Sequence, residues 1–127
     1  MPSYDATRFS PAAPVAQATL RNPHSGEMLS DVMLLLDSGA DITLLPRKAV
    51  EALAIQPNAG HGYELMGFDG SKSFAPAVTL DMILLNHIFQ GLYLLIEEEN
   101  GILGRDILNH VVLLLDGPRQ YWQEYES

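Results

Sequence analysis

The chain has 127 residues, of which 47% are apolar and 18% charged, which is the composition of one globular domain with a hydrophobic core. Its net charge of −9 argues against binding to a nucleic-acid backbone or to an anionic membrane surface. The absence of cysteine excludes disulfide bonds and a thiol nucleophile, and it fits a reducing compartment.

The N-terminal segment lacks the features of a targeting sequence. Residues 1–13 mix proline, alanine, serine and polar residues without periodicity, and they contain no basic region followed by an apolar stretch. We therefore expect residues 1–13 to form a flexible arm and residues 14–127 to form one domain. The longest apolar runs are too short to cross a bilayer, and we expect a cytoplasmic protein.

Short segments rich in aliphatic and β-branched residues alternate with turn signals along the chain. The expected strands cover residues 15–20, 29–36, 42–45, 63–66, 71–74, 78–85, 88–96, 111–115 and 120–125, and the expected helices cover residues 47–53 and 105–110. Segment 29–36 is apolar on both faces, which predicts a position inside a sheet. Strands of this number and length predict an all-β fold with one or two short helices, either a small barrel or a sandwich.

Asp37 follows five consecutive apolar residues and precedes Ser38 and Gly39. A carboxylate in that place is expected to be partly buried, which costs free energy unless the group is hydrogen-bonded, paired or protonated. One interpretation is structural, because aspartate before glycine caps turns well. The other is functional, because a small hydroxyl residue and a glycine that permits close backbone approach suit a reactive carboxylate.

A second segment, residues 102–108, repeats the order of apolar strand, glycine turn and polar residues before a short helix. Residues 35–41 and 102–108 together resemble the two signature motifs of the retropepsin-like aspartic proteases. Asp37 and Gly104 stand 67 positions apart (104 − 37), which is similar to the separation in that family. The long N-terminal segment and the predicted C-terminal hairpin make the chain more similar to cellular and bacterial single-domain relatives than to viral enzymes.

The resemblance implies a closed, barrel-like acid-protease fold of a single lobe that forms a homodimer, and it implies an aspartic endopeptidase. In such enzymes two aspartates share one proton and activate a water that attacks the peptide bond. This sequence has a single Asp-(Ser/Thr)-Gly triplet, since Ile107 and Leu108 follow Asp106. The second carboxylate is therefore expected from Asp37 of another copy, related by a two-fold axis.

The resemblance also implies roles for individual residues. Asp37, Ser38 and Gly39 form the expected catalytic triplet, in which Ser38 bonds across the two-fold axis. The expected substrate-binding residues, the last five of which form the tip of a flap hairpin, are Gly39, Ala40, Asp41, Met66, Gly67, Phe68, Asp69 and Gly70. Gly104 and Arg105 are expected to support the structure, with Arg105 paired to Asp41, because an unpaired charge there would be costly.

Two other interpretations stay open. The same fold suits a catalytically silent peptide-binding module or scaffold, because the expected flap tip contains an acidic residue and few glycines. It also suits a chain that acts only within a longer or processed protein, with residues 1–13 as a removable arm. We expect no cofactor and no metal, because the four histidines lack zinc-ligand spacing. The expected partners are a peptide or protein substrate and a second copy, with no nucleic acid and no membrane.

Overall fold

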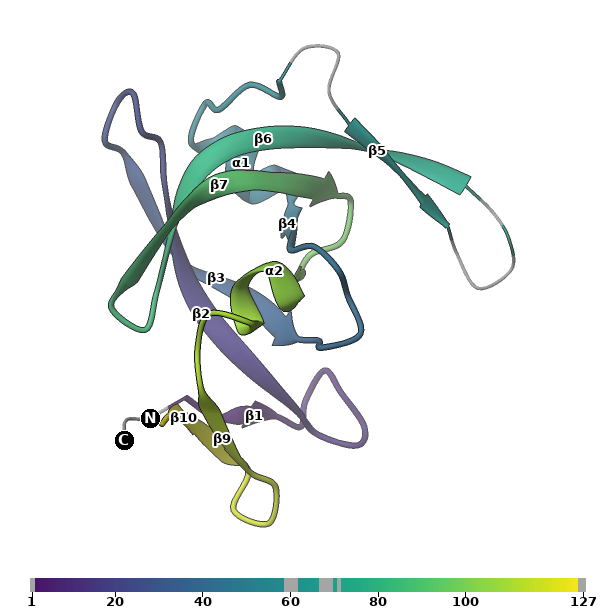
Figure 1. The fold of residues 1–127 in the computed structure, drawn as a ribbon, viewed down its shortest axis with the longest axis vertical. Coiled ribbons are helices and arrows are strands. Elements are labelled where there is room, and N and C mark those ends of the chain that lie inside the picture. The colour runs from purple at the N-terminus through teal and green to yellow at the C-terminus, as the bar shows by residue number, and fades with distance from the viewer. Residues whose placement is uncertain (1, 59–61, 67–69, 71, 126–127) are drawn as a thin grey trace.

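The computed structural model describes residues 2–58, 62–66, 70 and 72–125. Its elements in chain order are β1 (Tyr4–Asp5), β2 (Ala13–Arg21), β3 (Met28–Leu36), β4 (Leu44–Pro46), α1 (Arg47–Ala52), β5 (Gly62–Met66), β6 (Lys72–Leu84), β7 (His87–Ile96), β8 (Gly101–Leu103), α2 (Arg105–Leu108), β9 (Leu113–Asp116) and β10 (Tyr121–Glu124). Strands dominate and the helices are short, which confirms the all-β class (Figure 1).

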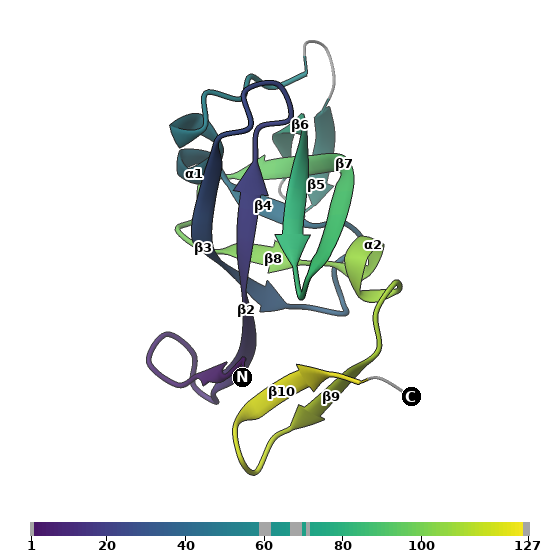
Figure 2. The same ribbon diagram turned by 90° about the vertical axis from the view of Figure 1, so that its left-hand side faces the viewer.

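Eight strands form one sheet in the order β1-β2-β3-β8-β4-β7-β6-β5. β2 pairs antiparallel with β3, and residues 19–21 of β2 also pair with residues 81–83 of β6. This second pairing joins the two sides of the sheet, so the strands curl into a barrel (Figures 1 and 2). The interior holds fully buried aliphatic side chains, among them Leu20, Leu34 and Leu80. The barrel alternative is therefore confirmed over the sandwich.

The two strands that carry the sequence motifs are neighbours in this sheet. β3 pairs in parallel with β8, and β8 also pairs with β4. Gly101 begins β8, and a Cβ there would overlap the Leu44 carbonyl oxygen and the Leu34 side chain, so only glycine allows this close approach. Asp37 and Gly104 follow the ends of β3 and β8, and the pairing therefore brings the two motifs together.

Both helices begin close to where the sequence predicts them. α1 follows Pro46, whose extended backbone ends β4, and α2 follows Gly104. Each helix buries one aliphatic side chain against the barrel, Val50 in α1 and Ile107 in α2. The helices contain six and four residues, and the described part of the chain has no helix long and apolar enough to cross a membrane.

One strand prediction was wrong. The expected strands 71–74 and 78–85 are a single continuous strand, β6, which runs through Pro76. Proline lacks the N–H that a central strand position must donate, and for that reason it is uncommon inside a paired strand. It is accommodated because β6 changes partner there: β6 pairs with β5 as far as Pro76 and with β7 from Ala77 onward.

The turn between β6 and β7 also differs by one residue from the expected Asn86-His87 connection. Leu85 and Asn86 form it, with positive φ angles of 52° and 65°. Such angles match the right-handed twist of the flanking strands in a two-residue hairpin. Leucine is an uncommon residue for this backbone, and its side chain compensates by packing against the core.

The N-terminal segment contacts the C-terminal hairpin. β1 pairs with β2, Ser3 forms a bridge with Tyr121, and the Trp122 N–H donates to the Pro2 carbonyl oxygen at 3.1 Å. The flexibility of residues 1–13 stays a prediction, and these contacts count against it.

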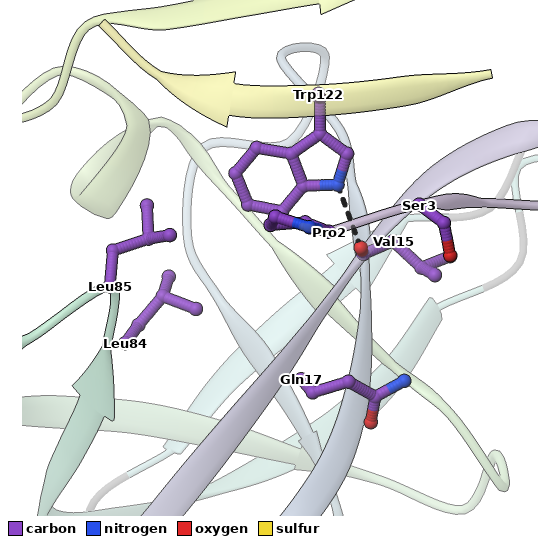
Figure 3. A pocket seen from close by; sticks show the side chains of 7 residues that line it. All are labelled: Pro2, Ser3, Val15, Gln17, Leu84, Leu85 and Trp122. Carbon is purple, nitrogen blue, oxygen red and sulfur yellow. Dashed lines mark hydrogen bonds between the residues drawn. The ribbon is translucent and has the colours of Figure 1, made fainter. Parts of the chain in front are cut away.

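β9 and β10 form the expected closing hairpin, which lies below the barrel in Figure 2. Trp122 is fully buried, and its indole Nε1 donates to the Val15 carbonyl oxygen of β2 at 2.9 Å (Figure 3). At the far end of β10, the Glu124 carboxylate lies 2.7 Å from Nε2 of His87. The hairpin is therefore anchored to the barrel by one buried aromatic residue and one exposed polar contact.

Candidate active site

Asp37 comes directly after β3 and is half-buried, as the apolar run before it predicts. Its N–H donates to the Leu103 carbonyl oxygen of β8 at 3.0 Å. Its Oδ1 accepts the Gly39 N–H at 2.9 Å, and its carbonyl oxygen accepts the Ala40 N–H at 3.1 Å. Asp37 therefore does cap the turn, and its Oδ2 receives no hydrogen bond from the described residues.

The residues after Asp37 leave the carboxylate accessible. A Cβ at Gly39 would lie 3.1 Å from Asp37 Oδ1, which is tighter than an ordinary contact, so glycine keeps the oxygen uncrowded. Ser38, Gly39 and Asp41 are exposed, and Ala40 is half-buried. The loop thus presents small side chains to solvent, where a substrate or a second chain can reach them.

Arg105 holds this loop from α2 at three points. Its N–H donates to the Ala40 carbonyl oxygen at 2.9 Å, its Nη1 to the Ser38 carbonyl oxygen at 2.6 Å, and its Nη2 to Asp41 Oδ1 at 2.5 Å. The predicted pairing of Arg105 with Asp41 is therefore present. Because the Asp41 side chain is 87% exposed, the charge attraction adds little stability, and the guanidinium acts mainly by fixing the loop geometry.

Gly104 lets the β8–α2 connection pass against the backbone of the same loop. A Cβ at this position would lie 2.7 Å from the carbonyl carbon of Ile42 and 3.1 Å from the carbonyl oxygen of Ala40. These are backbone atoms, which cannot move aside as a flexible side chain would. No residue larger than glycine fits without displacing the loop.

A buried polar cluster on the other side of the loop was missed in the sequence. Thr43 is fully buried, its N–H donates to Asp106 Oδ2 at 3.0 Å, and its hydroxyl donates to Asp106 Oδ1 at 2.7 Å. The same hydroxyl accepts the Gly104 N–H at 3.0 Å. A buried threonine requires partners, but nothing in the sequence pairs it with a residue 63 positions away. The cluster locks α2 to the start of β4.

The β5–β6 hairpin occupies the place in the chain where the sequence predicts a flap. Residues 62–66 pair antiparallel with residues 72–76, and Figure 1 shows the hairpin extending away from the barrel. Gly70 is exposed and has a φ of 83°, a left-handed conformation that glycine adopts without strain. The expected tip residues Gly67, Phe68 and Asp69 lie outside the described residues.

Two other features of the described chain offer less chemistry. No cluster of three or more histidine, aspartate or glutamate residues suited to a metal ion occurs among the described residues. The pocket beside Trp122, of about 310 Å³, contains none of the predicted site residues (Figure 3). Its lining residues, none of them an acid or a base, are Pro2, Ser3, Val15, Gln17, Leu84, Leu85 and Trp122. The loop of residues 37–41 is therefore a stronger candidate site than this pocket.

Comparison with known proteins addresses the fold. No family model matches the sequence, and no curated protein matches it. Among solved structures, the EIAV protease complexed with the inhibitor HBY-793 matches with a TM-score of 0.62 and 20% identity, over 77% of this chain and 86% of that chain. The chain has a retropepsin-like fold. The expected single-lobe acid-protease architecture is thereby confirmed.

The retropepsin-like fold brings most of the predicted site residues together. Residues 37–41 form one loop, and Gly104 and Arg105 contact that loop directly. Met66 lies at the end of β5 in the predicted flap hairpin. The catalytic, substrate-binding and supporting roles assigned from the sequence stay predictions.

Proposed function

We propose that the chain is an aspartic endopeptidase, active as a homodimer in which Asp37 of each copy holds a shared water molecule. The observation that carries this proposal is the state of the Asp37 carboxylate. Its Oδ1 is oriented by the Gly39 N–H, its Oδ2 receives no hydrogen bond from the described residues, and its loop is braced by Arg105. A half-buried, oriented carboxylate with a free oxygen suits proton transfer to and from water.

The second carboxylate comes from another copy, because the nearby acids of the same chain have other partners. Both oxygens of Asp106 accept hydrogen bonds from Thr43, and Asp41 pairs with Arg105. In a two-fold dimer the same loop faces its own symmetry mate. Ser38, which is exposed beside Asp37, is then placed to bond across the axis.

The proposed reaction is hydrolysis of a peptide bond. One carboxylate of the pair takes a proton from the water, whose oxygen bonds to the carbonyl carbon, while the protonated partner gives its proton to the carbonyl oxygen. The tetrahedral intermediate then gives a hydroxyl proton to the carboxylate that lost one, and the C–N bond breaks as the leaving nitrogen takes the proton of the other carboxylate, so the pair again holds one proton. Gly39, Ala40 and Asp41 contact the substrate backbone, and the tip of the β5–β6 hairpin closes over it.

We also propose that the chain is closer to cellular and bacterial single-domain relatives than to viral enzymes. Support comes from the hairpin of β9 and β10 after α2 and from the N-terminal strand β1, which packs beside it. These additions lengthen the chain at both ends without altering the loop of residues 37–41.

The test compares Asp37→Asn with Asp31→Asn, a matched change at an exposed carboxylate on β3 away from the loop. We expect the wild type and Asp31→Asn to cleave members of a peptide library between acid and neutral pH, and Asp37→Asn to cleave none. Specific cleavage that persists in Asp37→Asn contradicts the proposal. A dimer that binds peptides and never cleaves them overturns it in favour of a silent peptide-binding module.

A further inference from the structure

An open cavity lies along β3 before that strand reaches Asp37. Its volume is about 850 Å³, against about 310 Å³ for the pocket beside Trp122, and its lining includes none of residues 37–41. It is lined mainly by residues 29–33 of β3, residues 48 and 49 of α1, the loop of residues 97–100 and Arg8. A cavity of this volume can hold part of a bound peptide, and we call it the β3 groove.

The β3 groove has more acidic than basic side chains. Its charged lining residues are Arg8, Lys48, Asp31, Glu97, Glu98 and Glu99. The charge of Arg8 is offset by its ion pair with Asp5. The charge of Glu97 is offset by its ion pair with Arg47. The other three acids form no ion pair within the described residues, and they share the groove with one base, Lys48. The groove therefore has a surplus of two negative charges (3 − 1).

The β3 groove also has an apolar part. Leu29 and Met33 are half-buried there, and Val32 is buried. A lysine or arginine side chain suits this combination, because its aliphatic stem packs on apolar side chains while its charged end stays in water beside the acids. A small inorganic cation takes oxygen ligands and gains nothing from apolar side chains, so the lining favours a basic side chain over a metal ion.

The β3 groove is within reach of a peptide bound at Asp37. β3 and β8 run parallel and Leu34 pairs with Gly101, so residue 100 lies beside residue 33, four positions before Asp37 (37 − 33). A strand advances about 3.3 Å per residue, which makes this separation about 13 Å. An extended peptide advances at the same rate, so its residue about four positions from the bond at Asp37 reaches the groove. In Figure 1 the loops that follow β3 and β7 both lie to the right of the barrel, on the side toward which the β5–β6 hairpin extends.

We propose that the β3 groove is a specificity subsite in which Glu98 and Glu99 bind a lysine or arginine side chain of the substrate, about four residues from the bond that is cut. These two exposed acids directly precede residue 100, whereas Asp31 lies six positions before Asp37 (37 − 31). The proposal rests on the proposed function, because it places the occupant by its distance from Asp37. In a two-fold dimer each copy has one groove, so the preference for a basic residue applies on both sides of the bond.

Cleavage of a matched peptide series tests the charge preference. Once a library identifies one cleaved peptide, three versions of it carry lysine, glutamine or glutamate at the fourth residue from the cut bond on either side. We expect kcat/KM to fall in that order, with lysine favoured over glutamine by about fivefold, as exposed ion pairs allow. The ratio of kcat/KM for lysine to that for glutamine should fall toward one in the double variant Glu98→Gln, Glu99→Gln. An unchanged ratio overturns the proposal.

A second double variant controls for the net charge of the protein. Glu27 and Glu51 are exposed, and neither lines the β3 groove. The variant Glu27→Gln, Glu51→Gln has the same net charge as the groove variant, and it should retain the preference for lysine. Lys48→Gln removes the unpaired base of the groove and should raise the preference by about twofold. Equal ratios in the two double variants would assign the preference to net charge and overturn the proposal.

Binding to an inactive chain separates the groove from catalysis. Asp37→Asn is titrated with fluorescein-labelled Lys-Ala-Lys-Ala-Lys-Ala and with Gln-Ala-Gln-Ala-Gln-Ala, and binding is followed by fluorescence anisotropy. We expect the lysine peptide to bind about fivefold more tightly, and the difference to disappear when Glu98→Gln and Glu99→Gln are added. This binding preference in a protein whose wild type cleaves no peptide supports the groove and contradicts the proposed function. Cleavage without any preference for lysine overturns the groove alone.

Discussion

Asp37 and Asp106 follow two neighbouring parallel strands, β3 and β8, and both sequence motifs place a carboxylate after an apolar strand and a turn. Their surroundings nevertheless differ. Both oxygens of Asp106 accept hydrogen bonds from the buried Thr43. Asp37 accepts one, from Gly39, and its other oxygen has no donor among the described residues.

This difference indicates how one architecture separates an acid that is used within the chain from one whose second oxygen stays available. A carboxylate whose oxygens are both hydrogen-bonded within the chain contributes to stability and has little capacity left for a ligand. A carboxylate that is oriented through one oxygen keeps the other for water or substrate. Asp106 therefore supports the loop, and Asp37 is the residue that the loop presents.

The largest expected effect comes from removing the charge of the presented acid. In Asp37→Asn the amide oxygen can still accept the Gly39 N–H, so the free energy of unfolding should change by less than about 0.5 kcal/mol. Peptide cleavage should fall by at least about a thousandfold, because proton transfer through this group is lost. Urea denaturation and kcat/KM measured on the same preparation check both, and a large loss of stability would assign Asp37 to the structural class.

The next largest expected effect is the loss of stability when Asp106 loses its hydroxyl partner. Thr43→Val keeps the shape but leaves Asp106 Oδ1 and the Gly104 N–H without their hydroxyl partner, at an expected cost of about 1–3 kcal/mol. Thr79→Val on β6 is the matched control: its hydroxyl accepts a hydrogen bond from Asn58 Nδ2 at 3.0 Å, but at an exposed position where water can replace the partner, so the change should cost less than about 0.5 kcal/mol. Urea denaturation compares the two variants, and equal midpoints would show that the buried cluster does not stabilise the fold.

A comparable effect is expected from crowding the same connection. Gly104→Ala forces a Cβ against the Ile42 backbone, and we expect a loss of about 1–3 kcal/mol, at the lower end if β4 can shift. Gly117→Ala in the β9–β10 turn places its Cβ in open space and serves as the control. The thermal unfolding midpoints of the two variants should differ by several degrees. An unchanged midpoint for Gly104→Ala would mean that the loop backbone moves to accommodate the added Cβ without loss of stability.

The smallest effect concerns Tyr93, whose hydroxyl donates to the Phe89 carbonyl oxygen at 2.8 Å. Burial raises the pKa of Tyr93, and the negative charges of Asp106 and Asp81 raise it further. The unfolded chain releases the Tyr93 proton near the ordinary pKa of about 10, while the folded chain retains it to higher pH. The free energy of unfolding is therefore unaffected by this group below about pH 10, and it falls as the pH rises above that value.

Tyr93→Phe should remove this fall in the free energy of unfolding at alkaline pH. Asp106→Asn should make the fall smaller by a few tenths of a kcal/mol between about pH 9 and pH 11. Asp37→Asn should leave it unchanged, because Asp37 is not among the charges that raise the pKa of Tyr93. Urea denaturation as a function of pH measures the three variants. An equal response to the two aspartate changes would contradict the assignment of Asp106 to the interior network.

Local sequence signals predicted the parts of the molecule that local chemistry controls. The apolar run before Asp37 predicted its strand and its partial burial, and the turn residues Asp116 to Arg119 predicted the closing hairpin. The pairing of Arg105 with Asp41 was predicted by combining a family resemblance with the cost of an unpaired charge. In each case the deciding residues are adjacent in the chain or belong to a known pair of motifs.

Contacts fixed only by the folded barrel were not predictable. Thr43 and Asp106 meet because β4 and α2 are brought to the same end of β8, which no spacing in the sequence reveals. The expected strands 71–74 and 78–85 were kept apart because the change of pairing partner at Pro76, which makes β6 one strand, depends on where β5 ends. Which strands neighbour one another is a property of the whole sheet, and these two errors share that cause.

Trp122 gives the molecule an optical property of its own. It is the only tryptophan of the chain, it is fully shielded from solvent, and it contacts β2 across 107 positions of sequence. Docking of the hairpin therefore closes a long loop of chain, and contacts of such large sequence separation form slowly. Tryptophan fluorescence consequently monitors this docking without any added label, and a red shift of the emission would report the hairpin detaching from the barrel.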